Sequence, residues 1–550
     1  MIGFPSSSSH QPATPFPRRR PYPFYAERGM VAAAHPLAVE AGLFILRQGG
    51  NAIDAAVATG LAAAVVMPEM CGLGGDLFAI VSVDGTPVSV HGSGRSARNS
   101  SIELMRRHGG DTMPYQGPLS IAVPGMVDAY CELLERSGTK SFAEVAEPAV
   151  SLARDGFALQ PLGAQDIAEN ADLLARDEAA AAIFLANGRC PKAGDRLVQT
   201  DLARTLETIG REGKAAFYTG NIARRITAWL ERTGGVLGMD DFAEHETEFT
   251  TPLSTTYRGH RVFQTGIPTQ GLILLEALNI VENRPVDDPQ AVDAIHLLVE
   301  AKKLAYADRL GHAADPLFHE TPLTSLLSKA WAQSRFSQID PRRAATEVLH
   351  GDMQTGDTTY LCVVDGEGAM VSLIQSVSSA FGSGVVGGDT GVVLNNRAGR
   401  GFSLVAGHPN IYAPGKKTMH TLNCFLVADD HDVPVLVGGT PGGDGQPQWN
   451  LQMLAGLIDA GMDVQEAIEQ PRWTSWPGTD PISIDNPFEL RIEDRLPADT
   501  IAALEQRGHI VKRQEPWAGG GAAQIIARNP ETGLMIGGSD PRVEGTVLGF

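Results

Sequence analysis

The amino-acid sequence predicts an α+β protein with mainly antiparallel sheets, and three observations carry this prediction. Helical patterns dominate residues 101–250, strand and turn patterns dominate from residue 358 onward, and another hairpin pattern lies at residues 77–91. Helices in the middle of a chain with hairpins toward both ends are typical of this class. A chain of 550 residues with 43% hydrophobic content can also bury a large core, in one big domain or two closely packed ones.

The region after the N-terminal tail predicts two helices followed by a hairpin. Pro36 suits the first turn of a helix, and the glycines at 49–50 end it. Asn51 can cap a second, alanine-rich helix. An Asp-Gly turn then separates predicted strands at 77–83 and 87–91.

Two later segments bear on the site. Residues 293–309 place Leu297, Ala301 and Leu304 on one face of a helix, which indicates packing. Residues 340–357 are polar and punctuated by glycine, which predicts an exposed loop of the kind in which chains are cut.

Charge and cysteine content limit the partners and the compartment. The net charge of −20 argues against nucleic acid or an anionic membrane as the main partner. Five scattered cysteines without a CxxC motif suggest neither disulfides nor a zinc site, and fit a reducing compartment. Residues 1–28 are rich in Ser and Pro and lack an apolar signal region, so we expect a disordered tail and a cytoplasmic protein.

Several common enzyme classes are disfavoured because their motifs are missing. The sequence contains no GxSxG, GxxxxGK[ST] or HExxH. The segment GLGGDL lacks the third glycine and the preceding strand of a dinucleotide-binding turn, so we interpret it as a structural turn.

Thr358 opens the hairpin at residues 356–377 and is a candidate nucleophile. Cutting the chain before Thr358 would expose an α-amino group with an ordinary pKa of roughly 7.7 to 8.0. One residue would then supply both the attacking hydroxyl and its general base. Taken alone, the hairpin favours a plainer interpretation, in which Thr358 and Thr359 are β-branched residues that start a strand.

Gly442 and Gly443 lie between an apolar strand and a helix. Adjacent backbone N–H groups at such a position can converge on a developing oxyanion. An ordinary turn is the equal alternative. A hydroxyl candidate elsewhere in the chain gives weight to the oxyanion interpretation.

Seven stretches, in this order, resemble one family: GGNAIDAAVA, GLGGD, AVPGMVDA, TYRGHRV, HLLVEAKKLAYADR, TTYLCVVDGEGAMVS with FGSGVV and GVVLNNR, and GGSDPRVEG. Over roughly residues 29–545 the chain resembles the γ-glutamyltranspeptidase family of N-terminal nucleophile hydrolases. The resemblance implies a four-layer αββα sandwich with an additional helical lobe. It also implies self-cleavage between Asp357 and Thr358, with Thr358 as nucleophile and Gly442-Gly443 as oxyanion hole.

Beyond the expected tail at 1–28, the resemblance implies a large subunit at 29–357 that combines the helical lobe with part of the sandwich, and a small catalytic subunit at 358–550. The two chains would form a heterodimer. The partner is a small-molecule amide, with no nucleic acid and no membrane. No metal or organic cofactor is expected, because the chain supplies nucleophile, base and oxyanion donors.

The substrate-contacting positions depart from the glutathione-specific pattern. The arginine of the family's FREMAP-like motif corresponds to Ser93, with Arg95 nearby, and the acids that follow NNQM are replaced by Arg397 and Arg400. The remaining positions that the resemblance places around the substrate are Ser376, Ser378, His420, Thr421 and Asp444. His420 alone is more typical of a structural histidine, and the two arginines can equally be solvated loop charges.

These departures favour relatives that hydrolyse amides without a γ-glutamyl ammonium. The motifs HTLN and GGDxQPQ resemble the oxamate amidohydrolase-like branch most closely, and glutaryl-cephalosporin acylases form another branch. We therefore expect an autoprocessed threonine amidohydrolase that cleaves a small carboxylate-bearing amide, oxamate-like or glutaryl-type, through an acyl-enzyme. The alternatives are a γ-glutamyltransferase or glutathione hydrolase, and an inactive, uncleaved binding protein that keeps the fold.

Overall fold

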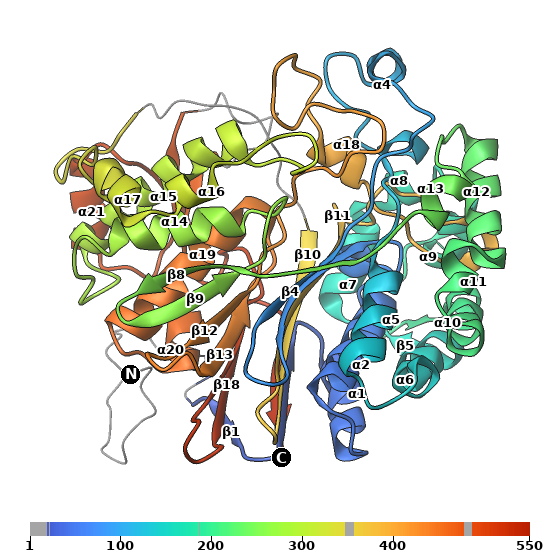
Figure 1. Ribbon diagram of the computed structural model, residues 1–550, viewed down its shortest axis with the longest axis horizontal. Helices are drawn as coiled ribbons and strands as arrows, with labels where there is room; N and C mark the ends of the chain where they lie inside the picture. The colour runs from blue at the N-terminus through green and yellow to red at the C-terminus, as the bar shows by residue number, and fades with distance from the viewer. Residues whose placement is uncertain (1–18, 21, 186–187, 347–356, 478–486) are drawn as a thin grey trace.

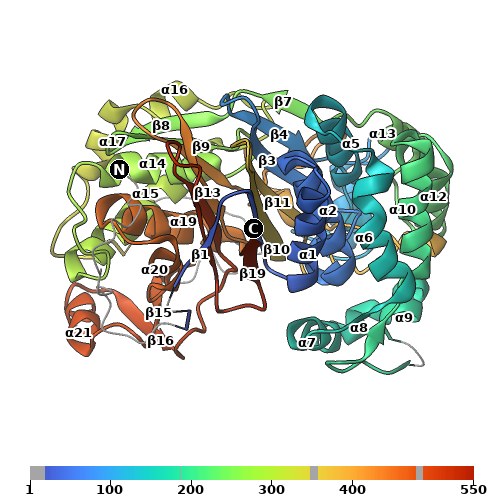
Figure 2. The same cartoon turned by 90° about the horizontal axis from the view of Figure 1, so that it is seen from below.

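The computed structural model describes residues 19–20, 22–185, 188–346, 357–477 and 487–550. Two seven-stranded sheets lie face to face between two layers of helices, as Figure 2 shows, and a further group of helices flanks one side (Figure 1). This is the αββα arrangement with an additional helical lobe. Among the described residues, no helix is both long and apolar enough to cross a membrane.

The first sheet contains the hairpin that begins at Thr358. Its order is β19 (Thr546–Gly549), β2 (Gly29–Ala33), β10 (Asp357–Asp365), β11 (Met370–Ser378), β3 (Asp76–Ser82), β4 (Val88–Gly92) and β7 (Glu248–Thr250). The second sheet runs β1 (Phe24–Ala26), β18 (Met535–Ser539), β17 (Gln524–Arg528), β13 (Pro434–Gly439), β12 (Phe425–Ala428), β9 (His260–Gln264) and β8 (Leu253–Tyr257). Neighbouring strands in both sheets are antiparallel.

Helices cover the outer face of each sheet. The first sheet is covered by α1 (Pro36–Arg47), α2 (Ala52–Val66) and α5 (Met126–Ser137), and α6 (Phe142–Asp155) packs against α2. The second is covered by α14 (Gly271–Val281), α15 (Val292–His312), α19 (Gln446–Leu454) and α20 (Val464–Glu469), with α16 (Leu323–Leu326), α17 (Lys329–Phe336) and α21 (Ala498–Gln506) at its edge.

The helical lobe and the connections complete the chain. They comprise α3 (Pro68–Cys71), α4 (Ile102–Gly109), α7 (Pro161–Glu169), α8 (Ala171–Leu174), α9 (Glu178–Phe184), α10 (Thr200–Glu212), α11 (Ala215–Tyr218), α12 (Asn221–Thr233), α13 (Met239–Ala243) and α18 (Arg397–Gly401). Two small sheets join β5 (Phe157–Ala158) to β6 (Arg196–Leu197), and β14 (Trp473–Trp476) to β15 (Glu489–Glu493) and β16 (Ile510–Gln514).

The alternation of side chains along β10 explains why the layers stack. Tyr360, Cys362 and Val364 pack in the core between the two sheets, whereas Leu361 and Val363 pack in the core beneath the helices. Successive side chains of a strand point to opposite faces, so an apolar run such as this one is buried on both sides. A residue that shares the even-numbered face of β10 therefore points between the sheets.

The predicted start of the fold is confirmed with small shifts. The helix expected at Pro36 ends at Arg47, and Asn51 forms a capping box with Asp54 at the start of α2. The hairpin strands begin one residue away from their predicted positions.

The expected tail at 1–28 is wrong at its C-terminal end. Residues 24–26 form β1 and pair with β18, and the backbone N–H groups of Arg19 and Arg20 donate to the Glu469 carboxylate. Residues 1–18 and 21 lie outside the described residues. The prediction failed because it was based on the Ser and Pro content of the tail, and residues 24–28 contain neither Ser nor Pro.

A buried carboxylate at the end of β15 ties several segments together. Glu493 accepts hydrogen bonds from Arg542 Nε at 2.6 Å, Arg495 Nη2 at 2.6 Å, Gly519 N at 2.9 Å and Arg472 N at 3.1 Å. Burial alone would raise its pKa, but the hydrogen bonds and charge of Arg542, aided by Arg495 and Arg472, lower the pKa of Glu493 to about 2. The charged carboxylate is therefore the form that stabilises the fold.

We expect Glu493→Gln to lower the free energy of unfolding by about 3 kcal/mol at pH 7, the equivalent of the pKa shift from the usual value. A depressed pKa contributes stability above the unfolded-state pKa, and this stability is lost as the pH falls toward about 2. Denaturant unfolding of both proteins should show a difference that is constant from pH 8 to about 5.5 and shrinks toward pH 3. A difference independent of pH would contradict the assignment.

Candidate active site

Thr358 is the second residue of β10 and its hydroxyl is buried at the end of the layer between the sheets. The side chain is 1% exposed, and its Oγ1 donates a hydrogen bond to Ser376 Oγ at 3.2 Å. The pairing of β10 with β11 is irregular at this point, because Asp357 lies opposite Ser378 while Thr359 lies opposite Gln375. This irregularity places an extra residue of β11 beside Thr358, as β-bulges near active sites do.

Ser378 ends β11 in a conformation that serine rarely adopts. Its φ is +91°, and its N–H donates to Ser376 Oγ at 2.7 Å. A non-glycine residue in this region costs free energy and persists only where its surroundings require it. The Thr358 hydroxyl and the Ser378 N–H thus both donate to Ser376 Oγ, and backbone strain is stored at Ser378, next to these hydrogen bonds.

The strand register brings an acid into the same row. Ser376 lies opposite Asp76, the first residue of β3, and continuing the β3–β4 pairing beyond Leu77 and Gly92 places Ser93 opposite Asp76. Asp76 is fully buried, and neither its Oδ1 nor the Ser93 hydroxyl has a hydrogen-bond partner among the described residues. The row Thr358, Ser376, Asp76 and Ser93 crosses four segments of the first sheet.

Arg397, at the start of α18, pairs with Asp76. The distance from Arg397 Nε to Asp76 Oδ2 is 2.8 Å, and the guanidinium side chain is 2% exposed. Burial raises the pKa of Asp76, and Arg397 opposes that rise. Arg397 Nη2 has no hydrogen-bond partner among the described residues, so one face of the guanidinium can still donate to a ligand.

Arg400, one helical turn further on, contacts Ser378 at the end of β11. Its Nη1 donates to the Ser378 carbonyl oxygen at 3.0 Å. Arg400 and Arg397 are both buried, so the alternative that they are solvated loop charges is wrong. Both belong to the five-residue helix α18, all of whose residues are buried.

His420 lies against Asp76 from the loop before β12. Its Nδ1 is 4.0 Å from Asp76 Oδ2, its ring packs against Phe78, and its side chain is fully buried. Burial, together with the positive charges of Arg397 and Lys417, holds the pKa of His420 well below its usual value. The ring is therefore neutral near pH 7, and neither nitrogen has a hydrogen-bond partner among the described residues.

Gly442 and Gly443 form a turn whose backbone only glycine adopts readily. Their φ angles are +121° and +54°, and a Cβ on Gly442 would come within 2.2 Å of the Trp449 ring. The Gly445 N–H donates to the Gly442 carbonyl oxygen at 2.8 Å. Since C=O and N–H of a trans peptide point in opposite directions, this bond fixes the direction of the Gly443 N–H.

Thr421 and Asp444 flank this turn. The Thr421 hydroxyl is buried without a hydrogen-bond partner among the described residues, whereas the Asp444 carboxylate accepts from Arg309 Nη1 at 2.7 Å. Asp444 is 2% exposed. An ion pair inside the protein thus engages the carboxylate that the resemblance placed against the substrate.

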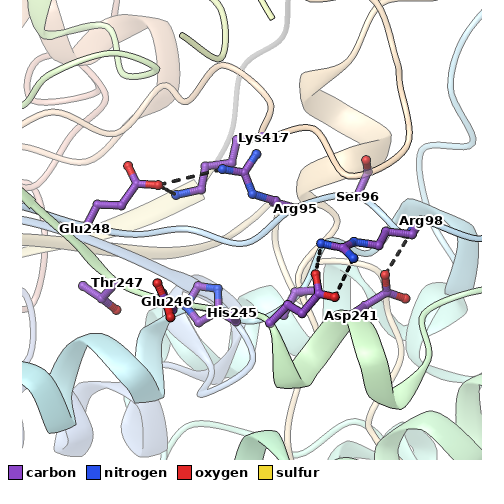
Figure 3. Close-up of a pocket in the computed structure, with 11 residues that line it drawn as sticks. Arg95, Ser96, Arg98, Asp241, His245, Glu246, Thr247, Glu248 and Lys417 are labelled. Atoms are coloured by element: carbon purple, nitrogen blue, oxygen red, sulfur yellow. Dashed lines mark hydrogen bonds and ion pairs between the residues drawn. The ribbon is translucent and has the colours of Figure 1, made fainter. Parts of the chain in front are cut away.

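Arg95 lines an open polar pocket of about 260 Å³ rather than the buried row (Figure 3). Its Nη1 donates to Asp315 at 3.0 Å and to the Gly415 carbonyl oxygen at 3.1 Å. Arg95 and Lys417 both reach toward Glu248, as Figure 3 shows. The residues that line this pocket do not include Thr358 or Gly443.

One group of side chains among the described residues could hold a metal ion, namely His296, Glu300 and His509. His296 Nδ1 and His509 Nε2 hydrogen-bond each other at 2.9 Å, and Glu300 pairs with Lys303 at 2.7 Å. Nitrogen atoms of both histidines and the Glu300 carboxylate are thus already engaged by protein groups. The cluster is separate from the row around Thr358.

Sequence reasoning missed several residues at the site. Asp76 was part of a segment interpreted as a turn, although a carboxylate at the start of an apolar strand was a signal. Arg309 belongs to the helix predicted to pack, and that packing is confirmed for Leu297, Ala301 and Leu304. Further along the same helix, Arg309 pairs with Asp444. Gln270, which contacts the glycine turn, gave no signal.

The first sheet places the Thr358 hydroxyl in one buried row with the unsatisfied atoms of Asp76 and Ser93, and the glycine turn presents backbone N–H groups of fixed direction. A hydroxyl attack on a carbonyl needs a base and stabilisation of the resulting oxyanion. Backbone N–H groups such as those of the glycine turn are of the kind that stabilise an oxyanion, and Arg397 and His420 keep polar atoms without a partner among the described residues.

Comparison with known proteins gives the family. Residues 38–550 match the sequence profile described as gamma-glutamyltranspeptidase. The chain is 38% identical over 529 residues to the "Glutathione hydrolase-like YwrD proenzyme" of Bacillus subtilis, covering 95% of this chain and 98% of that one. It is 34% identical to the "Oxamate amidohydrolase proenzyme" of Klebsiella pneumoniae, covering 95% and 98%.

A solved structure agrees along the whole chain. The cephalosporin acylase from Bacillus halodurans superposes with a TM-score of 0.91 at 35% identity, covering 100% of this chain and 99% of that one. The chain belongs to the γ-glutamyltranspeptidase family and is an amidohydrolase with the N-terminal nucleophile hydrolase fold.

Proposed function

We propose that the chain is a precursor that cuts itself between Asp357 and Thr358, and that the product hydrolyses small amides whose acyl group carries a carboxylate. The observation that supports this most directly is the buried Thr358 hydroxyl, which hydrogen-bonds Ser376 at the irregular start of β10. The relatives named above as proenzymes give further support.

The scission uses the Thr358 hydroxyl against its own peptide bond. Oγ1 attacks the Asp357 carbonyl carbon, the C–N bond breaks, and the nitrogen takes a proton to become the free α-amino group of Thr358. The resulting ester joins Asp357 to the threonine oxygen. Water then hydrolyses the ester, which leaves a C-terminal α-carboxylate on Asp357 and restores the Thr358 hydroxyl.

Turnover repeats this chemistry on a separate amide. The neutral α-amino group accepts the hydroxyl proton as Oγ1 attacks, and the developing oxyanion is stabilised by the backbone N–H groups of the Gly442-Gly443 turn. Collapse of the intermediate releases the amine with that proton and leaves an acyl ester on Thr358. Water hydrolyses the ester and restores the enzyme.

The cations near the nucleophile support this substrate class. Guanidinium groups match a carboxylate in geometry as well as in charge. Arg397 offers its Nη2, and neutral His420 offers a ring N–H, both from buried positions. A short acyl group that ends in a carboxylate, oxamate-like or glutaryl-type, fits this set of donors.

After scission, residues 358–550 would form the small catalytic subunit and residues up to 357 the large one. Each seven-stranded sheet contains strands from both segments. β2 pairs with β10 and β19, and β9 pairs with β12. We therefore expect the two chains to remain together as a heterodimer.

The experiment that tests the proposal is denaturing mass spectrometry of the purified protein after prolonged incubation. We expect two chains that meet at the Asp357–Thr358 bond, with the smaller one spanning the 193 residues from Thr358 to Phe550. Persistence of the intact chain alone, without hydrolysis of any carboxylate-bearing amide, would favour an uncleaved binding protein with this fold.

A further inference from the structure

Side chains of three residues that precede the proposed cleavage site hydrogen-bond to the residues of the glycine turn. Gln270, just before α14, donates from Nε2 to the Gly443 carbonyl oxygen at 2.8 Å. Tyr306 on α15 donates its hydroxyl hydrogen to the Asp444 carbonyl oxygen. Arg309, one turn further along α15, donates from Nη1 to Gln270 Oε1 and to Asp444 Oδ1, each at 2.7 Å.

These contacts hold the backbone of the turn in one conformation, which the two glycines alone would not do. Glycine loses more conformational freedom on folding than any other residue, so a two-glycine turn needs external support to hold one geometry. Gln270 immobilises the peptide that follows Gly443, and Tyr306 immobilises the next one. An oxyanion hole acts through donors that are already oriented before the reaction, so this support bears on the rate.

These contacts are buried and include an ion pair. Arg309 is 1% exposed and Asp444 is 2% exposed. Removing one member of a buried ion pair leaves the other charge without compensation, whereas removing both is often far less costly. Arg309 and Asp444 therefore act as a unit, with Gln270 held between Arg309 and Gly443.

We propose that Gln270, Tyr306 and Arg309 are positioning residues that hold the oxyanion turn, and that Asp444 is their anchor and not a contact for the substrate. This inference rests on the proposed function of the Gly442-Gly443 turn. It gives the large subunit a part in catalysis at a turn that belongs to the small subunit.

Steady-state kinetics of Arg309→Met, Asp444→Asn and the double variant test the inference. We expect each single variant to lower kcat by roughly tenfold or more, within the loss seen when one oxyanion donor is removed. KM should change by less than about threefold, because ground-state binding is untouched. The double variant should lose no more than the worse single variant, as expected for residues that act as a unit.

Two further variants keep the test decisive if the ion-pair variants fold poorly. Tyr306→Phe removes one oxygen atom and should lower kcat by about threefold or more at constant KM. Arg335→Met removes another arginine paired with α15, through Asp308, and should leave kcat within about twofold.

The outcomes separate this inference from the proposed function. An uncut, inactive wild-type protein would overturn the proposed function and this inference with it. A cut and active wild type whose Asp444→Asn variant raises KM at unchanged kcat would overturn the inference alone, because Asp444 would then bind substrate.

Discussion

Replacing Thr358 by valine is expected to leave the chain uncut and to lower amide turnover by on the order of a thousandfold or more, as when the nucleophile of a hydrolase is removed. Valine keeps the shape of threonine and removes the oxygen that attacks in both reactions. Denaturing mass spectrometry should show only the intact chain, and the amide assay should show background rates.

The adjacent threonine provides a matched control. Thr359 is equally buried, but its hydroxyl has no hydrogen-bond partner among the described residues, and it lies on the opposite face of β10 from Thr358. Thr359→Val should therefore still be cut and should keep kcat within about threefold. Scission of the Thr358→Val protein at the same bond would identify another nucleophile.

The second large effect concerns the choice of substrate. Two arginines lie buried beside the nucleophile row, so a donor ammonium would be buried among positive charges. An unpaired buried charge costs several kcal/mol, which corresponds to discrimination of about a hundredfold or more. We expect kcat/KM for oxamate or a glutaryl amide to exceed that for glutathione by this margin.

Both substrates should be compared on one preparation, with and without a dipeptide acceptor. The control variant is Arg397→Lys, which keeps the charge beside Asp76 but loses the Nη2 donor. This variant should selectively lower kcat/KM for the carboxylate-bearing substrate. Faster turnover of γ-glutamyl donors, stimulated by the acceptor, would mean that the Asp76 carboxylate holds the donor ammonium and that the protein is a γ-glutamyltransferase.

The sequence predicts single helices and hairpins because their causes are local, whereas the layered arrangement was expected from the family resemblance. The apolar run that opens the hairpin at residue 358, the Asn51 cap and the helix that begins at Pro36 all depend on neighbours within a few positions. The parts of the site that it could not predict are contacts between distant segments. Asp76 meets Arg397 across 321 positions, and Gln270 meets Gly443 across 173.

Local sequence patterns also could not predict whether a charged side chain is buried. Arg397 and Arg400 lie in a segment rich in glycine that reads as a loop, but the short helix α18 buries both of them. Arg95 shows the reverse, since a residue next to a family motif points into a polar pocket and pairs with Asp315 and Glu248. Tertiary packing decides both cases.

The place of β2 in its sheet links the proposed scission to folding. β2 lies between β10, which carries Thr358, and β19, which includes residues 546–549. Residues 546–549 must therefore have been made before both edges of β2 are paired. If the proposed scission needs the completed sheet, the reactive amine forms only in folded molecules, and a partly synthesised chain carries no active hydrolase.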